Sequence, residues 1–273
     1  MSTRNAPSGA VKQVTSLANP LVKEIRALHL KKHRDAAGLF LAEGHKLVRD
    51  GLDEGWALNT LVCGAGSLRE GAVGPLAARA RAAGALVLEV SRAVLEKVSR
   101  RENPQTVLGV FRQKTAPLSR LGEGGLWVAL DRVRDPGNLG TIIRTADSAG
   151  AAGVALVGPS CDPFAVETVR ATMGSIFHVP LVRADAAGFL ARVEAAGARL
   201  VGTHLAGTVD FRAADYRFPC IILMGNEQQG LADELVAACD ELVRIPMAGK
   251  ADSLNLAVAT GLMIYEAMRG ELR

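Results

Sequence analysis

Short, almost wholly apolar runs alternate with amphipathic stretches from Leu126 to the C-terminus. Continuous apolar runs are typical of strands buried on both faces, as in a parallel sheet, and apolar residues at helical spacing indicate helices. The pattern predicts strands at 126–130, 153–157, 178–182, 199–203, 219–224 and 242–245, and helices at 138–149, 166–173, 186–196 and 231–238. We therefore expect a parallel α/β sheet covered on both faces, with ligands beyond the carboxyl ends of its strands.

A last helix follows the polar triplet Ser253-Leu254-Asn255 and is apolar on nearly every side. A helix with this composition is expected to be buried. Asp and Ser are favoured N-cap residues, so helix capping is the simplest explanation of Asp252 and Ser253. A role in a binding site is the alternative, and the other motifs of the chain are needed to choose between the two.

The first part of the chain shows shorter α/β units. We expect a helix over 14–34 with Pro20 in its first turn, then strands at 39–42, 58–63, 85–90 and 107–113 and helices at 46–54, 75–83 and 92–101. Residues 114–125 contain Pro117 and three glycines, which is typical of a linker. These patterns divide the chain into a flexible tail (1–13), a small α/β domain (14–115), a linker (116–125) and a larger domain (126–273).

Composition narrows the class of protein. The chain of 273 residues is long enough for two domains. It has no apolar run long enough to cross a membrane and no apolar signal region at its start, so we expect a cytoplasmic protein without a membrane partner. Its four cysteines are far apart and do not pair with histidines at ligand spacing, so we expect no metal site.

Charge is distributed unevenly along the chain. Residues 1–115 contain 18 Lys and Arg against 10 Asp and Glu, a net charge of +8, whereas residues 116–273 contain 14 against 18, a net charge of −4. A basic front half suggests a polyanionic partner, although a solvated basic face is an equally good explanation of charge alone. The run Lys31-Lys32-His33-Arg34 suits both a helix C-terminus and a phosphate backbone.

The loop after the first strand of the larger domain carries Asp135-Pro136-Gly137-Asn138, a turn in which Asn138 is a candidate N-cap. Arg144 follows on an apolar stretch of the helix and needs an anionic partner there. A salt bridge to Asp147 or to a partner elsewhere in the chain is the simplest possibility, and a bound anionic group is the other.

A second loop follows the apolar strand 219–224 and reads Gly225-Asn226-Glu227-Gln228-Gln229-Gly230. Gly225 would let a ligand approach the backbone. Glu227 would anchor a ligand or cap the next helix. The chain contains neither GxGxxG after a strand nor GxxxxGK[ST], which disfavours dinucleotide and triphosphate folds.

Three motifs in this order, NLGTIIR, LMGNEQQGL and IPMAGKADSLNLAVA, resemble those of the SpoU/TrmH family of RNA ribose 2′-O-methyltransferases. The front stretch FLAEGHKLVRDGL resembles the substrate-binding domain of that family, which is similar to a small ribosomal RNA-binding protein. The resemblance implies an α/β sheet with a deep trefoil knot, an S-adenosylmethionine cofactor that becomes S-adenosylhomocysteine, no metal, and a homodimer. The implied reaction is methyl transfer to a ribose 2′-hydroxyl of structured RNA.

The resemblance also assigns site residues. The catalytic positions are Asn138, Arg144, Glu227, Ser253 and Asn255. The cofactor-binding positions are Thr203, Leu223, Met224, Gly225, Asn226, Ile245, Met247 and Leu254. For RNA we expect contacts from Arg26, Lys31, Lys32, Arg34, Glu43, Gly44, Lys46, Arg132 and Arg134.

The residue types fit this chemistry. A fixed positive charge beside the weakly acidic hydroxyl would stabilise the developing alkoxide, a role that suits Arg144. A guanidinium holds its proton tightly and is a poor general base. The asparagines and Glu227 would orient the ribose or Arg144, and Ser253 would position the hydroxyl or cap the helix.

Ribosomal RNA is the expected substrate because of the two-domain layout. Transfer RNA, a non-catalytic RNA-binding protein and a small-molecule methyltransferase are the alternatives, and the basic front half disfavours the last of these.

Overall fold

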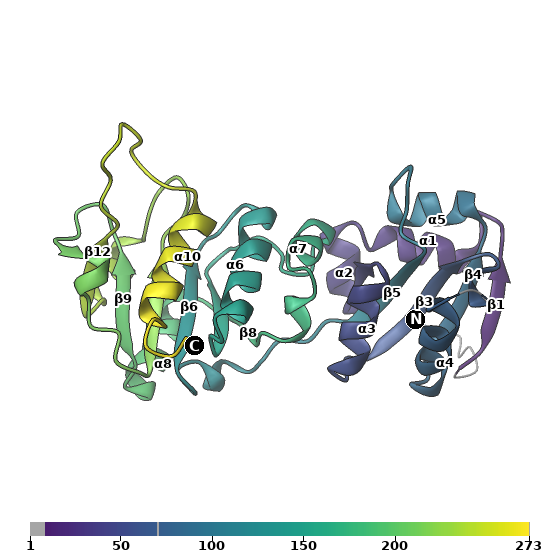
Figure 1. Cartoon of the computed structure of the whole chain (residues 1–273), viewed down its shortest axis with the longest axis horizontal. Coiled ribbons are helices and arrows are strands. Elements are labelled where there is room, and N and C mark those ends of the chain that lie inside the picture. The colour runs from purple at the N-terminus through teal and green to yellow at the C-terminus, as the bar shows by residue number, and fades with distance from the viewer. Residues whose placement is uncertain (1–8, 70, 273) are drawn as a thin grey trace. The chain divides into compact units, whose positions relative to one another are not determined.

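The computed structural model describes residues 9–69 and 71–272 (Figure 1). The chain folds into two compact units: unit 1 comprises Met1–Lys114 with Phe164–Phe177, and unit 2 comprises Thr115–Pro163 with His178–Arg273. The greater part of the predicted tail, residues 1–8, lies outside the described residues. None of the described helices has the length and apolar composition needed to cross a membrane.

Unit 1 is built on a mixed five-stranded sheet with the order β1-β4-β3-β5-β2. Its strands are β1 (Val11–Val14), β2 (Leu39–Glu43), β3 (Leu58–Gly64), β4 (Leu86–Val90) and β5 (Val107–Arg112). Its helices are α1 (Pro20–Ala27), α2 (Lys31–Ala37), α3 (His45–Asp53), η1 (Ser67–Arg69), α4 (Val73–Ala82), α5 (Arg92–Ser99), α7 (Val166–Ala171) and η3 (Ser175–Phe177).

The predicted helix over 14–34 is wrong at its start and is interrupted near Leu30. Val11–Val14 form an edge strand paired in parallel with Val87–Val90, so this stretch is neither flexible tail nor helix. The remainder breaks into α1 and α2, because Leu30 adopts an extended conformation. Nη1 of Arg34 lies 2.9 Å from the carbonyl oxygens of both Leu28 and His29, so its guanidinium satisfies the polar groups exposed by the break.

Residues 164–177 belong to unit 1, although their position in the sequence places them in the larger domain. Phe164 packs on Phe40 and Phe177 on Phe111, with ring centroids 4.9 and 5.0 Å apart. Nη2 of Arg170 lies 2.6 Å from Oε2 of Glu43. This part of the core is a tertiary contact between distant segments, which hydropathy periodicity does not report.

Unit 2 contains the predicted parallel sheet: all of its seven described strands pair in parallel, in the order β10-β12-β9-β11-β6-β7-β8. The strands are β6 (Leu126–Asp131), β7 (Gly153–Val157), β8 (Leu181–Ala184), β9 (Arg199–Thr203), β10 (Val209–Asp210), β11 (Cys220–Met224) and β12 (Glu241–Arg244). The helices are η2 (Leu118–Arg120), α6 (Pro136–Ser148), α8 (Ala186–Ala196), η4 (Phe211–Ala213), α9 (Asp233–Ala237) and α10 (Leu256–Ala267). The α/β class is confirmed, and the trefoil knot stays a prediction.

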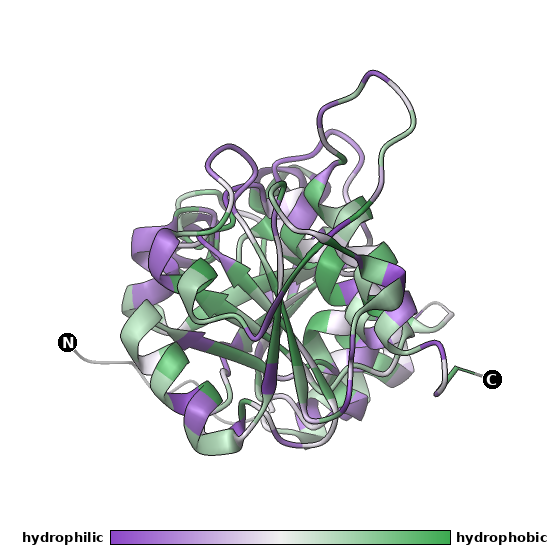
Figure 2. Ribbon diagram, turned by 90° about the vertical axis from the view of Figure 1, so that its left-hand side faces the viewer, coloured by the Kyte–Doolittle hydropathy of each residue, from purple (hydrophilic) through white to green (hydrophobic). Residues whose placement is uncertain are grey.

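Helices cover the two faces of this sheet in pairs. Trp127 and Ile221 share a core with side chains of α8 and α9, whereas α6 and α10 lie side by side and pack against β7 and β11 on the other face. The central strands are hydrophobic (Figure 2), as expected for strands covered on both faces.

The prediction that α10 is buried all round is wrong for the single chain. Val258, Leu262 and Tyr265 are 54%, 42% and 47% exposed. Their spacing of four and then three residues places them on one face of the helix. Composition indicated that the helix is apolar, but it could not show that one apolar face is exposed because no described part of the chain packs against it.

Candidate active site

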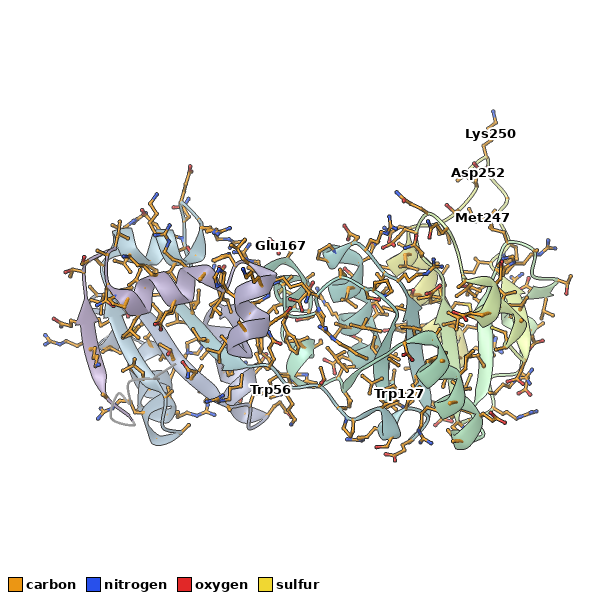
Figure 3. All side chains as sticks on the ribbon, turned by 180° about the vertical axis from the view of Figure 1, so that it is seen from behind. Trp56, Trp127, Glu167, Met247, Lys250 and Asp252 are labelled. Atoms are coloured by element: carbon orange, nitrogen blue, oxygen red, sulfur yellow. The ribbon has the colours of Figure 1, made fainter. Side chains whose placement is uncertain are left out.

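The candidate site lies at the carboxyl edge of the unit 2 sheet. Strands β12, β9, β11 and β6 are consecutive neighbours in the sheet and, being parallel, end at the same edge. The loops 132–135, 225–230 and 245–255 leave from this edge. Figure 3 shows Met247, Lys250 and Asp252 on the last of these loops, which extends away from the strands.

Helix α6 is capped by Asp135, not by Asn138 as the turn predicts. Oδ1 of Asp135 accepts a hydrogen bond from the backbone N–H of Asn138 at 2.6 Å, and Pro136 occupies the first turn. Asn138 is therefore three residues inside the helix start, where its side chain is not needed for capping. The amide of Asn138 is left free to serve the site.

A continuous hydrogen-bonded chain joins three residues: the N-cap of α10, a residue in the first turn of α6, and a residue on the loop after β11. Nδ2 of Asn255 donates to Oδ1 of Asn138 at 2.9 Å, and Nδ2 of Asn138 donates to Oε1 of Glu227 at 3.2 Å. Glu227 also accepts from the backbone N–H groups of Asp135 and Arg134, each at 3.3 Å. The structure thus brings together three of the five predicted catalytic residues.

The direction of this chain is fixed by the backbone at its ends. Asn255 is the N-cap of α10, and its Oδ1 accepts from the N–H groups of Ala257 and Val258 at 2.9 and 3.3 Å. Its Nδ2 is consequently the group that points to Asn138, which determines the orientation of both amides. The capping role expected of Asp252 or Ser253 belongs to Asn255.

A compact clamp holds the loop that carries Glu227. Arg132 makes two 2.9 Å hydrogen bonds to the carboxylate of Asp131, which is 3% exposed, and a third of 2.9 Å to Oε1 of Gln229. Nδ2 of Asn226 donates to the carbonyl of Arg132 at 2.6 Å. Arg132, which we predicted to contact RNA, is committed to the clamp, and its backbone adopts a left-handed conformation with φ 50°.

Gly225 serves the fold of the same loop. A Cβ at this position would lie 2.5 Å from both the carbonyl carbon of Gly230 and the nitrogen of Leu231. The close neighbour is therefore the loop's own backbone, which explains the glycine without a ligand.

Arg144 stands on α6 with an exposed side chain. Within the described part of the chain, its guanidinium has neither a hydrogen-bond acceptor nor an ion-pair partner. The simple alternative, a salt bridge to Asp147, is wrong because Oδ2 of Asp147 lies 3.0 Å from Nδ1 of His178. Arg144 is therefore available to an anionic group from outside the chain.

The predicted cofactor residues provide apolar surface and backbone groups at the same edge. Leu223 and Met224 are buried, and Oγ1 of Thr203 donates to the carbonyl of Leu223 at 3.4 Å. Met247 and Leu254 are exposed to 40% and 36%. Ser253 is exposed as well and makes no described side-chain contact.

Cys161 lies near this network, although sequence reasoning did not single it out. Burial, helped by the charges of Glu227 and Asp135, raises the pKa of its thiol to about 12. A thiol that stays protonated is a poor nucleophile, so Cys161 is not suited to covalent catalysis. Among the described residues, no group of three or more His, Cys, Asp and Glu is placed to hold a metal ion.

Five of the predicted RNA-binding residues of unit 1 fall into two classes. Arg26, Lys31 and Lys32 are exposed, although Lys31 pairs with Asp35 at 2.5 Å. Arg34 and Glu43, by contrast, are only 4% and 7% exposed. Their buried side chains stabilise unit 1 and are not placed on a surface that RNA can reach.

The other three predicted RNA-binding residues are Gly44, Lys46 and Arg134, and two of them already bond to other side chains. Lys46 donates to Asp50 at 2.5 Å, Gly44 adopts φ 107° before α3, and Nη1 of Arg134 is 3.4 Å from Oε1 of Gln228. Arg134, in unit 2, is exposed. Of these three residues, Arg134 is the one that lies beside the site network.

Comparison with known proteins gives two family matches. Residues 125–265 match the SpoU rRNA Methylase family, and residues 19–109 match the MRM3-like substrate binding domain. The chain is 31% identical over 260 residues to the 23S rRNA (guanosine(2553)-2′-O)-methyltransferase RlmP of Bacillus subtilis, covering 95% of this chain and 100% of the relative.

Two solved structures cover nearly the whole chain. An AdoMet-bound rRNA methyltransferase from Sinorhizobium meliloti is 56% identical, with a TM-score of 0.91 and coverage of 96% of this chain and 99% of the other. The SpoU methyltransferase AviRb from Streptomyces viridochromogenes, in complex with AdoMet, is 32% identical, with a TM-score of 0.82 and coverage of 93% and 98%.

Proposed function

The chain belongs to the SpoU rRNA methylase family, and from this premise we propose that it transfers a methyl group from S-adenosylmethionine to a ribose 2′-hydroxyl of ribosomal RNA. The observation that carries the proposal is the hydrogen-bonded chain Asn255–Asn138–Glu227, which joins the start of α10, the first turn of α6 and the loop after β11 at the carboxyl edge of the sheet. The guanidinium of Arg144 on α6, which has no partner among the described residues, adds the charge that the reaction needs.

The residues at this edge fit S-adenosylmethionine. Leu205, Met247 and Leu254 expose apolar surface on the loops that follow β9 and β12. Within the described residues, the backbone of 246–254 makes no backbone hydrogen bond, so its polar groups are available to a ligand. The bound cofactor would supply a methyl group already activated by a sulfonium, and Thr203, Met247 and Leu254 would hold its adenosine part.

Positioning and charge are the contributions that we assign to the protein. Asn138 and Asn255 each retain one N–H that no described residue accepts, and these N–H groups would hold the ribose in line. Glu227 already accepts three hydrogen bonds, which suits an orienting carboxylate. Arg144 would stabilise the developing alkoxide or clamp a neighbouring phosphate. Ser253 would join the site by positioning the hydroxyl.

Unit 1 would hold the RNA. Its match to a substrate-binding domain and the net charge of +8 over residues 1–115 support this assignment. Deleting residues 1–115 is a poor test of it, because Phe164 and Phe177 would lose the aromatic side chains against which they pack. Point variants on the surface of unit 1 are preferable. We expect the protein to act in the cytoplasm.

The exposed face of α10 supports a homodimer. We expect Leu262→Glu, which places a charge among Val258, Leu262 and Tyr265, to convert a dimer into a monomer in analytical ultracentrifugation. Val11→Glu is the matched control, because Val11 is 43% exposed on β1 of unit 1. A monomeric wild type, or a dimer unaffected by Leu262→Glu, would refute this interface.

The reaction is tested with purified protein, S-adenosylmethionine carrying a tritiated methyl group, and protein-free large-subunit ribosomal RNA. We expect tritium in the RNA and, after digestion, in a 2′-O-methylated nucleoside. RNA binding without any transfer would instead identify a non-catalytic RNA-binding protein.

A further inference from the structure

The ends of α1 and α5 meet at His29 in unit 1. Nε2 of His29 lies 2.7 Å from the carbonyl oxygen of Val98, and its backbone N–H donates to the carbonyl of Arg26 at 3.3 Å. Lys32 follows in the first turn of α2, so His29 lies between the end of α1 and the start of α2 in the chain, and its ring bonds to the end of α5. Residues close to these ends in sequence are consequently neighbours in space.

The cations at these helix ends are exposed. Arg26 is in the last turn of α1, Lys32 is in the first turn of α2, and Lys97, Arg100 and Arg101 lie at the end of α5. Arg26, Lys32, Lys97 and Arg100 have no ion-pair partner within the described residues. Together with Arg101, these four residues form what we call the His29 surface.

Arg100 lies two residues beyond Val98, whose carbonyl oxygen is 2.7 Å from Nε2 of His29. Burial is the main cause of the lowered pKa of His29, and the charges of Arg100 and Arg170 lower the pKa further, opposed by the Val98 carbonyl and by Glu43. The imidazole is therefore neutral near pH 7 and contributes no charge of its own. Arg100 acts on His29 from the α5 side of the surface.

Backbone geometry presents two of the cations to solvent. Arg100 closes α5 in a left-handed conformation with φ 55°, which is uncommon for a residue other than glycine. The turn leaves Arg100 and Arg101 consecutive and exposed, and Nε of Arg101 lies 3.8 Å from Oε2 of Glu43. The left-handed residue ends the helix, and its backbone N–H bonds to the carbonyl of Glu96, so the Arg100 side chain is not needed for the cap.

The acidic residues nearby do not neutralise the surface. Asp35 pairs with Lys31, Glu96 with Arg92, and Glu43 with Arg170, at 2.5, 2.8 and 2.6 Å. Glu24 and Glu102 remain as exposed carboxylates, against the five cations of the surface. Four of the five cations have no ion-pair partner among the described residues, and Arg101 shares Glu43 with Arg170. Such an excess of long cations is suited to a chain of phosphates.

We propose that the His29 surface binds the sugar–phosphate backbone of the RNA substrate, with Lys97, Arg100 and Arg101 as contacts that the sequence did not single out. This inference rests on the proposed function, because it takes RNA as the substrate. Phosphate contacts fix the register of RNA on the protein and make the affinity strongly dependent on salt. Leu30, 53% exposed, is the one large apolar side chain exposed among these described helix ends, which favours RNA over a membrane surface.

The test uses the full chain with Lys97→Glu and Arg100→Glu combined. Binding to protein-free large-subunit ribosomal RNA is measured over a series of salt concentrations. We expect affinity to fall at least about tenfold at low salt, and the slope of log K against log salt to become shallower by about 2, one for each lost phosphate contact. S-adenosylmethionine affinity should stay within about twofold, because phosphate contacts act on RNA alone.

The matched control combines Lys12→Glu with Arg69→Glu. These residues carry the same charge change on β1 and η1, are exposed, and have no described ion pair. Combining Lys97→Arg with Arg100→Lys should keep wild-type binding. Thermal melts verify that every variant is folded.

An equal loss of affinity in both charge-reversal variants would mean that only net charge matters, and no loss would mean that RNA does not bind here; either result overturns the proposal. The same proteins are assayed for methyl transfer. A wild type that binds RNA through this surface but transfers no methyl group would refute the enzyme assignment alone.

Discussion

Replacing Arg144 by alanine is expected to abolish methyl transfer to RNA while the affinity for S-adenosylmethionine stays within a few-fold. The Arg144 guanidinium is exposed on α6, the helix that also carries Asn138, and no described residue neutralises it. Removing one donor aimed at a developing oxyanion lowers rates by roughly 10²–10³-fold. Because Arg144 makes no described contact with the loops assigned to the cofactor, its loss should not open that site.

Single-turnover rates and calorimetric titration with the cofactor measure the two effects separately. Arg144→Lys keeps the charge but loses the planar fork, so we expect it to retain part of the rate. Ser148→Ala, one turn further along α6 and exposed, is the matched control and should behave as wild type. Loss of cofactor binding in a folded Arg144→Ala protein, or an undiminished rate, would refute the assignment.

Replacing Arg170 by alanine is expected to destabilise unit 1 by about 3 kcal/mol, the loss that follows when a buried ion pair is broken on one side. The side chain of Glu43 is 3% exposed, and its Oε1 has no described hydrogen-bond partner. Without Arg170, Glu43 keeps only the guanidinium of Arg101, 3.8 Å away, among its described ion-pair partners. The effect is local to unit 1, so hydrogen exchange of the β2 and β5 amides is the suitable measurement.

Two controls separate charge from packing. Combining Glu43→Gln with Arg170→Ala removes the unpaired buried charge and should recover a large part of the lost stability. Arg92→Ala breaks an exposed pair, with side chains 76% and 36% exposed, and should change stability by less than about 1 kcal/mol. Unaltered exchange of β2 in Arg170→Ala would show that the ion pair does not stabilise unit 1.

Hydropathy predicts much of unit 2, because its strands are short apolar runs covered on both faces and therefore visible one at a time. Residues 164–177 could not be assigned this way. Their contacts are with β2 and with Phe111, more than fifty positions earlier in the chain, and periodicity carries no information about such pairs. The break between α1 and α2 was hidden for a similar reason, since it depends on Arg34 folding back onto Leu28 and His29.

The sequence predicted which residues form the candidate site, but not the hydrogen bonds that join them. The motif resemblance identified Asn138, Glu227 and Asn255, and the structure joins them. Sequence reasoning gave the capping roles to the wrong neighbours, because Asp, Ser and Asn are all good N-caps and only the backbone path selects among them. The clamp between Asp131 and Arg132 was missed, although a buried acid followed by an arginine at a strand end was a usable signal.

Mapping 2′-O-methylated riboses across total RNA, from cells with and without this protein, tests methyl transfer most directly. We expect the loss of methylation at a defined ribose of ribosomal RNA, restored by the wild-type chain and not by Arg144→Ala. A change confined to transfer RNA would contradict the ribosomal substrate, and an unchanged methylation pattern would contradict methyl transfer itself.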